Sequence, residues 1–263
     1  MKTKFAIGVL VQWYESSIIE YYIDSLKDAI ERYDGEVIVD VCIIADTTLE
    51  KPTSQEDKEL AIEKIDDICE EAFGYNYTRN EYEKLYTIAD YRREFNDKYC
   101  TEADVLVWGE SDMLVPKQSF VVLDHLHQNV DSPKYLATFS ICKMWDDSWK
   151  SLEHPEFTDK PFIEMDTKNW WSLRYTMSKE EMNRFNDKVE DIDVSIISPH
   201  KFNGCGLVIS SEVIKAGVNI PKSVFFIHED TAVMMMTDKV LGNIPQYLFK
   251  NIRVVHNRKH PDK

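Results

Sequence analysis

The chain has 263 residues, 43% of them hydrophobic, which is enough for one large α/β domain or two small ones. It carries 31 lysines and arginines against 47 aspartates and glutamates, and the net charge of −16 opposes passive binding to nucleic acid or to an anionic membrane. The five cysteines are widely spaced and lack a C-x-x-C pair, a pattern that favours reduced thiols in a cytoplasm over a disulfide framework or a zinc site. No stretch approaches the roughly 18 apolar residues of a membrane span, so we expect a cytoplasmic protein with no membrane partner.

The chain begins with alternating strand and helix signals. An apolar run at residues 5–11 predicts a strand, and apolar residues at helical spacing after Ser17 predict a helix that this serine caps. The turn at residues 34–35 ends the helix, and a second apolar run at residues 37–45 predicts a second strand. Strand, helix and strand at this spacing form a parallel βαβ unit.

Two further helices are expected before the next strand. Residues 50–71 carry nine acids and three lysines around a thin apolar stripe, which predicts a solvated helix. Residues 80–99 predict a second helix, and the apolar run at residues 105–108 predicts a strand buried on both faces of a parallel sheet. The order β-α-β-α-α-β is Rossmann-like but lacks the glycine-rich loops of dinucleotide and P-loop enzymes. We therefore expect metal and side chains to hold any phosphate.

Glu110 and Asp112 follow the run at residues 105–108, with only Ser111 between them. Residues i and i+2 of an extended segment point the same way, so both carboxylates are expected at the carboxyl end of this strand, where open α/β sheets bind ligands. Two anions there need a cation or hydrogen-bond donors. A hard divalent ion carrying a phosphate group would suit them. A plain polar exit from the strand is the alternative, and these residues alone do not choose between the two.

The second half of the chain is less regular. A strand is expected at residues 135–142, followed by an aromatic and charged insertion at residues 143–199 that is too long for a plain loop. Residues 202–206, which include two glycines, predict a tight loop whose backbone approaches its neighbours closely. A strand at residues 207–209 and a short helix from Ser211 are expected after it.

Two ionisable stretches close the sequence. His228, Glu229 and Asp230 precede a predicted helix at residues 232–241, and Asp230 or Thr231 is expected to cap it. Residues 250–263 carry five lysines and arginines and two histidines against one aspartate. This basic tail either docks on the acidic body or binds a phosphate.

The order and spacing of these features resemble the GT-A nucleotide-sugar glycosyltransferases, particularly the family 2 group, over most of the chain except residues 143–199. The resemblance implies an α/β GT-A fold, with a Rossmann-like, mostly parallel sheet covered by helices on both faces. It implies a single domain, residues 1–263, with a nucleotide-binding half at residues 1–115. The acceptor-binding half, residues 116–263, would contain the acceptor-side insertion and the basic C-terminal tail.

The resemblance also assigns roles to particular residues. Asp112, with Glu110 in place of the first aspartate of the D-x-D motif, would bind Mn²⁺ or Mg²⁺, and His256 would be a further metal or phosphate contact. Asp230, beside Glu229 in an E-D pair, would be the catalytic base. The donor nucleotide sugar would contact Gln12, Tyr14, Asp46, Arg92, Arg93, Ser111 and Arg258. The Q-x-x-R-W motif of processive synthases is absent from the sequence, so polymer synthesis is not expected.

The implied activity is metal-dependent, hexosyltransferase-like transfer of a sugar from a nucleotide sugar, expected to be a UDP-sugar, to an acceptor hydroxyl. The acceptor remains open between a glycan and a hydroxymethylated or glycosylated base in bacteriophage DNA, in which case the enzyme would act in the host cytoplasm. Low glycine content, 8 residues, together with abundant lysine, glutamate, aspartate, isoleucine, tyrosine and asparagine, suggests A+T-rich coding, as in some bacteriophages and bacteria. The net charge of −16 opposes DNA binding. Two alternatives share the fold: a catalytically inactive nucleotide-sugar-binding protein, and a nucleotidyltransferase, although the glycine-rich loop of the latter is not found near the first strand.

Overall fold

The computed structural model describes residues 1–45, 54–83, 86–143, 172–173, 178–196, 204–225 and 228–256. The strands are β1 (Phe5–Gln12), β2 (Val37–Ile44), β3 (Thr78–Tyr82), β4 (Val105–Trp108), β5 (Met113–Leu114), β6 (Leu136–Lys143), β7 (Ser172–Leu173), β8 (Val194–Ile196), β9 (Val208–Ser210) and β10 (Gln246–His256). The helices are the 3₁₀ turn η1 (Trp13–Glu15), α1 (Ile19–Glu31), α2 (Gln55–Phe73), α3 (Ile88–Tyr99), α4 (Ser119–Asn129), α5 (Lys179–Asn186), α6 (Ser211–Lys215) and α7 (Glu229–Leu241).

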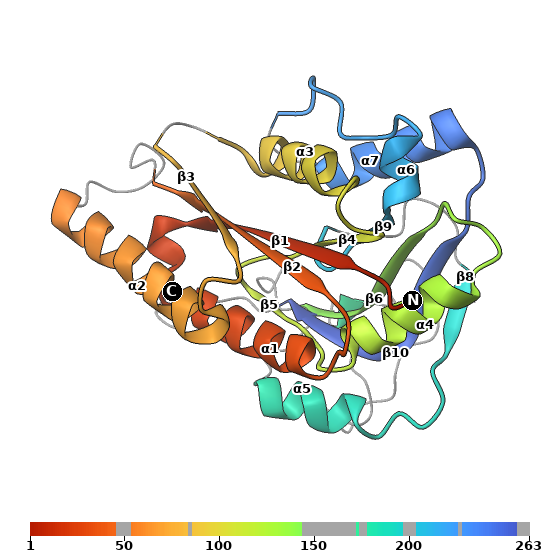
Figure 1. Cartoon of the computed structure of the whole chain (residues 1–263), viewed down its shortest axis with the longest axis horizontal. Helices are drawn as coiled ribbons and strands as arrows, with labels where there is room; N and C mark the ends of the chain where they lie inside the picture. Colours follow the sequence, from red (N-terminus) through yellow and green to blue (C-terminus); the bar gives the residue numbers. More distant parts are fainter. Residues whose placement is uncertain are drawn as a thin grey trace.

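The strands in this described part of the chain form one sheet in the order β3-β2-β1-β4-β9-β6-β10-β5, with β7 beside β6 and β8 beside β10 (Figure 1). The first four are parallel, so their carboxyl ends share one edge. Strand β9 runs antiparallel to both β4 and β6, and β10 is parallel to β6. Mixed pairing therefore joins the nucleotide-binding half expected from the sequence to the second half.

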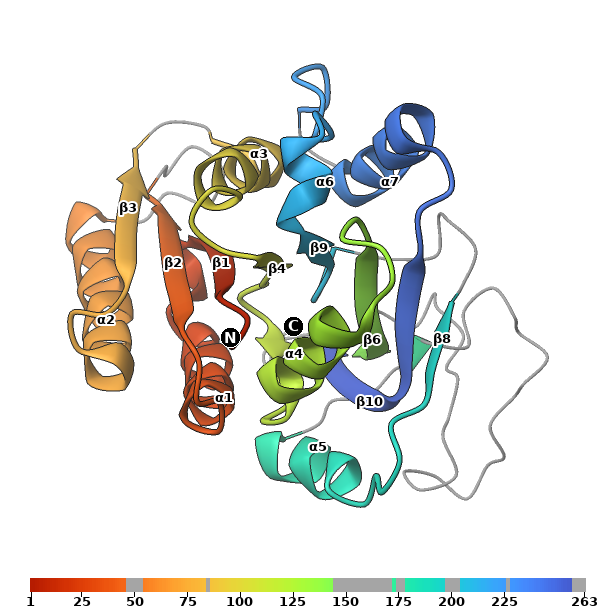
Figure 2. The ribbon, with the colours of Figure 1, turned by 45° about the vertical axis from the view of Figure 1, so that its right-hand side comes forward.

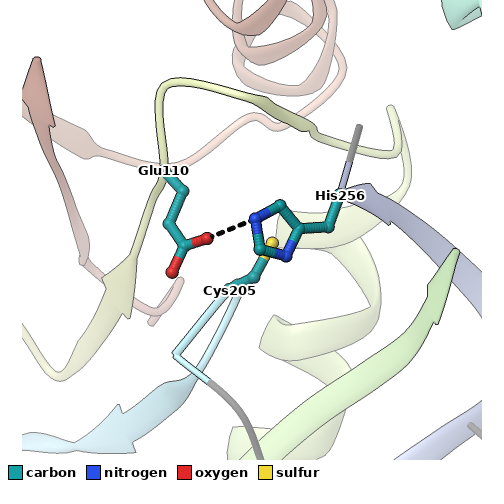
Figure 3. A group of neighbouring side chains, drawn as sticks. All are labelled: Glu110, Cys205 and His256. Atoms are coloured by element: carbon teal, nitrogen blue, oxygen red, sulfur yellow. Dashed lines mark ion pairs between the residues drawn. The ribbon is translucent and has the colours of Figure 1, made fainter. Parts of the chain in front are cut away.

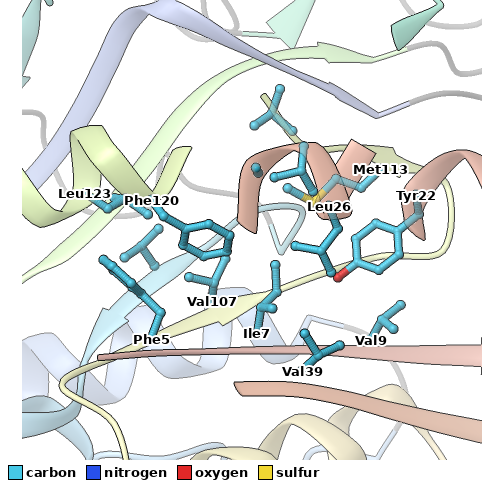
Figure 4. Close-up of a cluster of buried hydrophobic side chains, with 14 of the residues drawn as sticks. Phe5, Ile7, Val9, Tyr22, Leu26, Val39, Val107, Met113, Phe120 and Leu123 are labelled. Carbon is cyan, nitrogen blue, oxygen red and sulfur yellow. The ribbon is translucent and has the colours of Figure 1, made fainter. Parts of the chain in front are cut away.

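Helices cover both faces of the sheet (Figure 2). Successive residues of β1 point to opposite faces, and both faces are apolar, so each supports its own core. Phe5, Ile7 and Val9 pack with α1, α2 and α4. Figure 4 shows Phe5 beside Phe120 of α4, and Ile7 and Val9 on the side of Leu26 and Tyr22 of α1. Alternate residues of β1 pack with α3, α6 and α7 on the other face. Burial on both faces explains why β1 reads as a continuous apolar run.

The N-terminal half differs from the expectation at two places. Residues 80–82, predicted to begin a helix, belong to β3 and are followed by α3 only from Ile88. Strand β3 lies at the end of the sheet and alternates between half-buried and exposed residues, so its sequence Thr-Arg-Asn-Glu-Tyr has no apolar run to reveal it. Ser17 does not cap α1, whose N-cap is Ile18 without a side-chain hydrogen bond.

The second half contains elements that the sequence pattern did not predict. Helix α4 was not expected, and residues 250–256, assigned to a basic tail, form the second half of β10 between β6 and β5. Helix α7 begins at Glu229 with His228 as its N-cap, so Asp230 and Thr231 lie inside the helix and do not cap it. The strand at residues 207–209 and the helix from Ser211 are confirmed as β9 and α6.

No helix in the described ranges is both long and apolar enough to cross a membrane. Of the expected insertion at residues 143–199, the structure describes α5, β7, β8 and their immediate neighbours. Helix α5 packs along β10, and its Asn186 side-chain amide donates a hydrogen bond to the carbonyl of Arg253, 3.0 Å away.

Candidate active site

The acidic pair lies in a turn at the carboxyl end of β4. The backbone NH of Met113 donates to the carbonyl of Glu110 at 3.0 Å, which bends the chain where an extended segment was expected. Gly109 starts this turn with its NH 2.7 Å from the carbonyl of Gly8. A Cβ at Gly109 would lie 2.3 Å from the Tyr22 hydroxyl oxygen, so only glycine fits here without displacing α1. Close packing of the backbone thus determines where the two carboxylates leave the sheet.

The His256 imidazole forms ion pairs with the carboxylates of both Glu110 and Asp112, and Figure 3 shows the pair with Glu110. His256 ends β10 opposite Met113 of β5, and its Nε2 lies 2.8 Å from Glu110 Oε2 and 3.1 Å from Asp112 Oδ1. Burial lowers the pKa of His256, but the Cys205 sulfur and the carboxylates of Glu110 and Asp112 outweigh it, so the pKa lies well above its usual value. Both carboxylates therefore meet the positively charged His256 imidazole. The turn after β4 brings them together, and not the alternation of side chains along an extended strand.

Cys205 lies in the same cluster. One ligand atom from each of Glu110, Cys205 and His256 lies within 4.8 Å of the others, and the cysteine is 1% exposed. Burial raises the pKa of the Cys205 thiol in spite of the neighbouring His256. Cys205 and His256 therefore influence each other's ionisation, and the two carboxylates add to the stabilisation of the charged imidazole.

Arg92 of α3 connects the acidic pair to α7. Its Nη2 donates to Glu110 Oε1 at 2.9 Å and to the carbonyl of Gly204 at 3.2 Å, and its Nη1 donates to Glu229 Oε1. The side chain is 2% exposed. Burial opposes ionisation of Glu110, but His256 and Arg92 outweigh it and lower the pKa of this carboxyl group. One buried guanidinium thus bridges two of the carboxylates that the sequence predicted to act at the site.

Glu229 and Asp230 lie in the first turn of α7, where the helix dipole favours negative charge. Glu229 is buried, and burial raises its pKa while Arg92 opposes the shift. Asp230 is half-buried, and its Oδ1 accepts a hydrogen bond from the Thr231 NH at 2.6 Å. His228 has a φ of 66°, in the left-handed region, which turns the chain sharply into the helix. The turn presents Glu229 to Arg92 and leaves the Asp230 side chain partly exposed.

The loop after β1 approaches the same edge. Gln12 ends β1, and the 3₁₀ turn η1 carries Trp13, Tyr14 and Glu15. The backbone NH of Gln12 donates to Glu15 Oε2 at 2.8 Å. Burial raises the pKa of Glu15 to about 7, and the carboxylates of Asp112 and Glu110 add to this shift while hydrogen bonds from Gln12 and Ser111 oppose it. Ser111 is therefore close to Glu15, and three acidic side chains from two loops influence one another.

Other predicted donor contacts lie apart from this cluster or outside the described residues. Arg93 donates to the carbonyls of Ile220, Pro221 and Val224 and to the Asp90 carboxylate. Its guanidinium therefore anchors the segment between α6 and α7 to α3, and the structure does not bring it to the acidic pair. Asp46 and Arg258 fall outside the residues that the structure describes.

Sequence reasoning missed three residues of the site. Cys205 was noted only within residues 202–206 and Trp108 only within the run at residues 105–108, and Glu15 was given no role. Only the glycines on either side of Cys205 could have indicated that the backbone holds this cysteine in a particular place. The indole of Trp108 lies under the Arg92 guanidinium, 4.6 Å from Arg92 Cζ to the ring centroid, and nothing in the sequence pattern pairs them.

The side chains of the cluster fit a divalent cation. Two carboxylates from the turn between β4 and β5 converge with an imidazole from the end of β10. Carboxylates combined with substrate phosphates are the ligands that magnesium-type ions take. A fourth candidate, the Cys205 sulfur, is adjacent. We therefore regard this cluster as the candidate metal centre of the molecule.

Comparisons with known proteins find similarity in structure alone. No family model matches the sequence, and no curated protein sequence matches it. The crystal structure of residues 1–349 of S. aureus TarS in complex with UDP-GlcNAc is similar over 98% of this chain, with a TM-score of 0.57 and 10% identity. The crystal structure of GalNAc-T7 with UDP, GalNAc and Mn²⁺ is similar over 99% of this chain, with a TM-score of 0.59 and 11% identity.

The chain spans 60% of the length of the TarS fragment and 45% of the GalNAc-T7 chain. Both neighbours have the GT-A fold, and the mixed α/β architecture described above, a mostly parallel sheet covered by helices, matches that fold. The fold class expected from the sequence is therefore confirmed, and the architecture of this chain is GT-A.

Proposed function

We propose that this protein is a glycosyltransferase that moves a sugar from a UDP-sugar to an acceptor hydroxyl with the help of a divalent ion. The observation that carries the proposal is the convergence of Glu110, Asp112 and His256 at the carboxyl edge of the sheet. Ligands bind at that edge in open α/β sheets. The solved complexes of similar fold with UDP-GlcNAc, and with UDP, GalNAc and Mn²⁺, support the choice of donor and ion.

Asp112, Glu110 and His256 would hold the ion, which supplies Lewis-acid assistance to departure of the diphosphate. The partly exposed Asp230 carboxylate would accept the proton of the attacking hydroxyl, as a general base within hydrogen-bond reach. Arg92 was expected to touch the donor, but it is 2% exposed. We therefore assign it a positioning role, in which it holds Glu110 and Glu229 in a fixed relation to the two reacting groups.

Residues 1–115 would hold the nucleotide, through Gln12, Tyr14 and Ser111, and the second half would hold the acceptor. For the acceptor we propose a glycan hydroxyl, because the net charge of −16 disfavours a duplex. A hydroxymethylated DNA base is the competing acceptor. It predicts binding to modified duplex that weakens steeply as salt rises, since phosphate contacts release counterions.

The test is a screen of UDP-, GDP- and CMP-sugars with and without Mn²⁺, which measures release of free nucleotide. We expect Mn²⁺-dependent release from one UDP-sugar, loss of release in Asp112→Asn, and a fall in kcat in Asp230→Asn. The matched control is Asp67→Asn on the exposed face of α2, which should behave as the wild type. Binding of UDP without turnover of any donor would instead identify an inactive nucleotide-sugar-binding protein.

A further inference from the structure

The loop that carries Cys205 is fixed in place by its two flanking glycines. A Cβ at Gly204 would lie 2.2 Å from Arg92 Nη1, so the backbone approaches the guanidinium as closely as only glycine allows. Gly206 has a φ of +71°, a conformation that glycine adopts without strain. The close packing of Gly204 and the backbone conformation of Gly206 together determine the position of Cys205.

Backbone hydrogen bonds attach the same loop to the end of β4. The carbonyl of Gly204 accepts from Arg92 Nη2 at 3.2 Å, and the NH of Gly206 donates to the carbonyl of Trp108 at 2.9 Å. Glu110 comes two residues after Trp108. The Cys205 side chain, 1% exposed, is therefore held beside the acidic turn and not free to rotate into solvent.

Three distant segments thereby contribute one ligand atom each to a small volume. The atoms from Glu110, Cys205 and His256 all lie within 4.8 Å of one another, and Figure 3 shows the sulfur next to the imidazole ring. Zinc bonds of about 2.0 to 2.3 Å to oxygen, nitrogen and sulfur place tetrahedral ligand atoms roughly 3.4 to 3.6 Å apart. The present limit of 4.8 Å is wider than that spacing, so a bound ion would draw the three atoms closer together.

We propose that Cys205 is a thiolate ligand of the divalent ion, together with His256 and the acidic pair. The inference rests on the metal in the proposed function and deepens it, because a sulfur ligand changes which ion is preferred. Thiolate selects zinc and similar thiophilic ions over magnesium, whose sites are built of oxygen. On binding, the sulfur–hydrogen bond of Cys205 breaks and a sulfur–metal bond forms, the protonated His256 imidazole loses the proton of its ligating nitrogen, and both protons pass to the buffer.

The competing explanation is that Cys205 is a small buried apolar residue with no ligand role, which is common for free cysteines. That explanation predicts no contact between sulfur and a bound ion. Cobalt(II) distinguishes the two, because a cobalt–thiolate bond gives a strong near-ultraviolet charge-transfer band that oxygen and nitrogen ligands do not give.

The experiment titrates the full chain with Co²⁺ in the presence of UDP and records the absorption spectrum. We expect the thiolate band at one equivalent of Co²⁺, its loss in Cys205→Ser, and its retention in Cys100→Ser. Cys100 is a suitable control because it lies one residue past α3, and a serine there can keep the hydrogen bond to the Asp97 carbonyl. Competition with Zn²⁺ measures the zinc affinity. We expect Cys205→Ser to bind Zn²⁺ at least about tenfold more weakly than the wild type, because loss of a residue that only orients a metal ligand already costs about that much.

Each other outcome overturns the inference. Weak visible bands of bound Co²⁺ without the charge-transfer band would show an ion held without sulfur, which leaves the proposed function intact. A charge-transfer band that persists in Cys205→Ser would assign the sulfur ligand to another cysteine. Absence of any Co²⁺ binding would contradict both this inference and the metal ion of the proposed function. Transfer from the donor would still be tested independently, by the release of free nucleotide.

Discussion

The guanidinium of Arg92 lies over the indole ring of Trp108, with Arg92 Cζ 4.6 Å from the ring centroid. In the same position it donates to Glu110, which follows β4, and to Glu229, which begins α7. Arginine alone combines a planar stacking surface with a fork of donors. The relation therefore links the acidic turn to the helix that carries the proposed base.

Replacement of this arginine by lysine is the first prediction. Arg92→Lys keeps one positive charge but loses the stack and cannot donate to both carboxylates in the same geometry. We expect the free energy of unfolding to fall by about 1–3 kcal/mol, the range for lost hydrogen bonds to charged groups, together with a lower kcat for donor turnover. Urea denaturation and nucleotide release measure the two effects.

Arg93→Lys is the control for that variant. Arg93 binds backbone carbonyls away from the acidic pair, so its replacement should reduce stability without a specific loss of kcat. Equal kcat values for Arg92→Lys and the wild type would contradict the positioning role.

Gly204→Ala tests the close approach of the loop to Arg92. The new methyl group would lie 2.2 Å from Arg92 Nη1, and Glu229 and Trp108 prevent the guanidinium from moving away. We expect a loss of about 1–3 kcal/mol, as for overpacked cores. A double-mutant cycle with Arg92→Lys checks the cause, because two changes at one contact should not be additive. Simple addition of the two losses would place the damage elsewhere.

Asp124→Asn tests a buried carboxylate far from the site. Asp124 of α4 accepts from the Thr3 NH at 3.0 Å and from the Thr3 hydroxyl at 2.6 Å. Burial opposes ionisation, but these bonds and the nearby Lys2 lower the pKa of Asp124 below its usual 3.8. The ionised form is therefore stabilised in the folded state, which contributes stability at neutral pH that is lost as the pH falls below about 4.

For this variant we expect a loss of about 1–3 kcal/mol at pH 7 and convergence with the wild type in acid. Urea denaturation across the pH range measures the difference. A constant difference at all pH values would show that the charge of Asp124 is not involved.

Removal of metal is the fourth prediction. Without an ion, the protonated His256 imidazole offsets the charges of Glu110 and Asp112. A chelator should therefore abolish Mn²⁺-dependent turnover while the far-ultraviolet circular dichroism stays unchanged. Because the pKa of His256 is raised in the fold, its contribution is full below the unfolded value of 6.5 and is lost as the pH rises through the folded value.

The Tm of the chelated protein should accordingly decrease towards alkaline pH. His256→Gln should have a lower Tm near neutral pH and a weaker dependence on alkaline pH. The same alkaline dependence in His256→Gln and the wild type would assign the effect to another group.

The sequence predicted the elements whose burial shows in their composition. Strands β1, β2 and β4 are apolar on both faces and read as continuous runs, whereas β3 is half exposed and carries no such signal. Glu110 and Asp112 were found because they are adjacent in sequence. His256 was assigned to the metal from the family resemblance, whereas Cys205 was given no role. Both reach the acidic pair through pairings of β9 and β10 that the residue pattern did not reveal. The charges of Lys250 and Arg253 suggested a tail, because they interrupt the apolar residues of the second half of β10.

The position of β10 in the chain has a consequence for biosynthesis. A ribosome that has translated residues 1–245 has already produced the acidic turn, Arg92 and α7, but not the strand that pairs with β5 and β6. Until that strand has emerged and docked, the carboxylates of Glu110 and Asp112 lack the imidazole that draws them together. Nascent chains should therefore collapse around the first core well before they can capture an ion, and the competence of the site should depend on the last described strand to be synthesised.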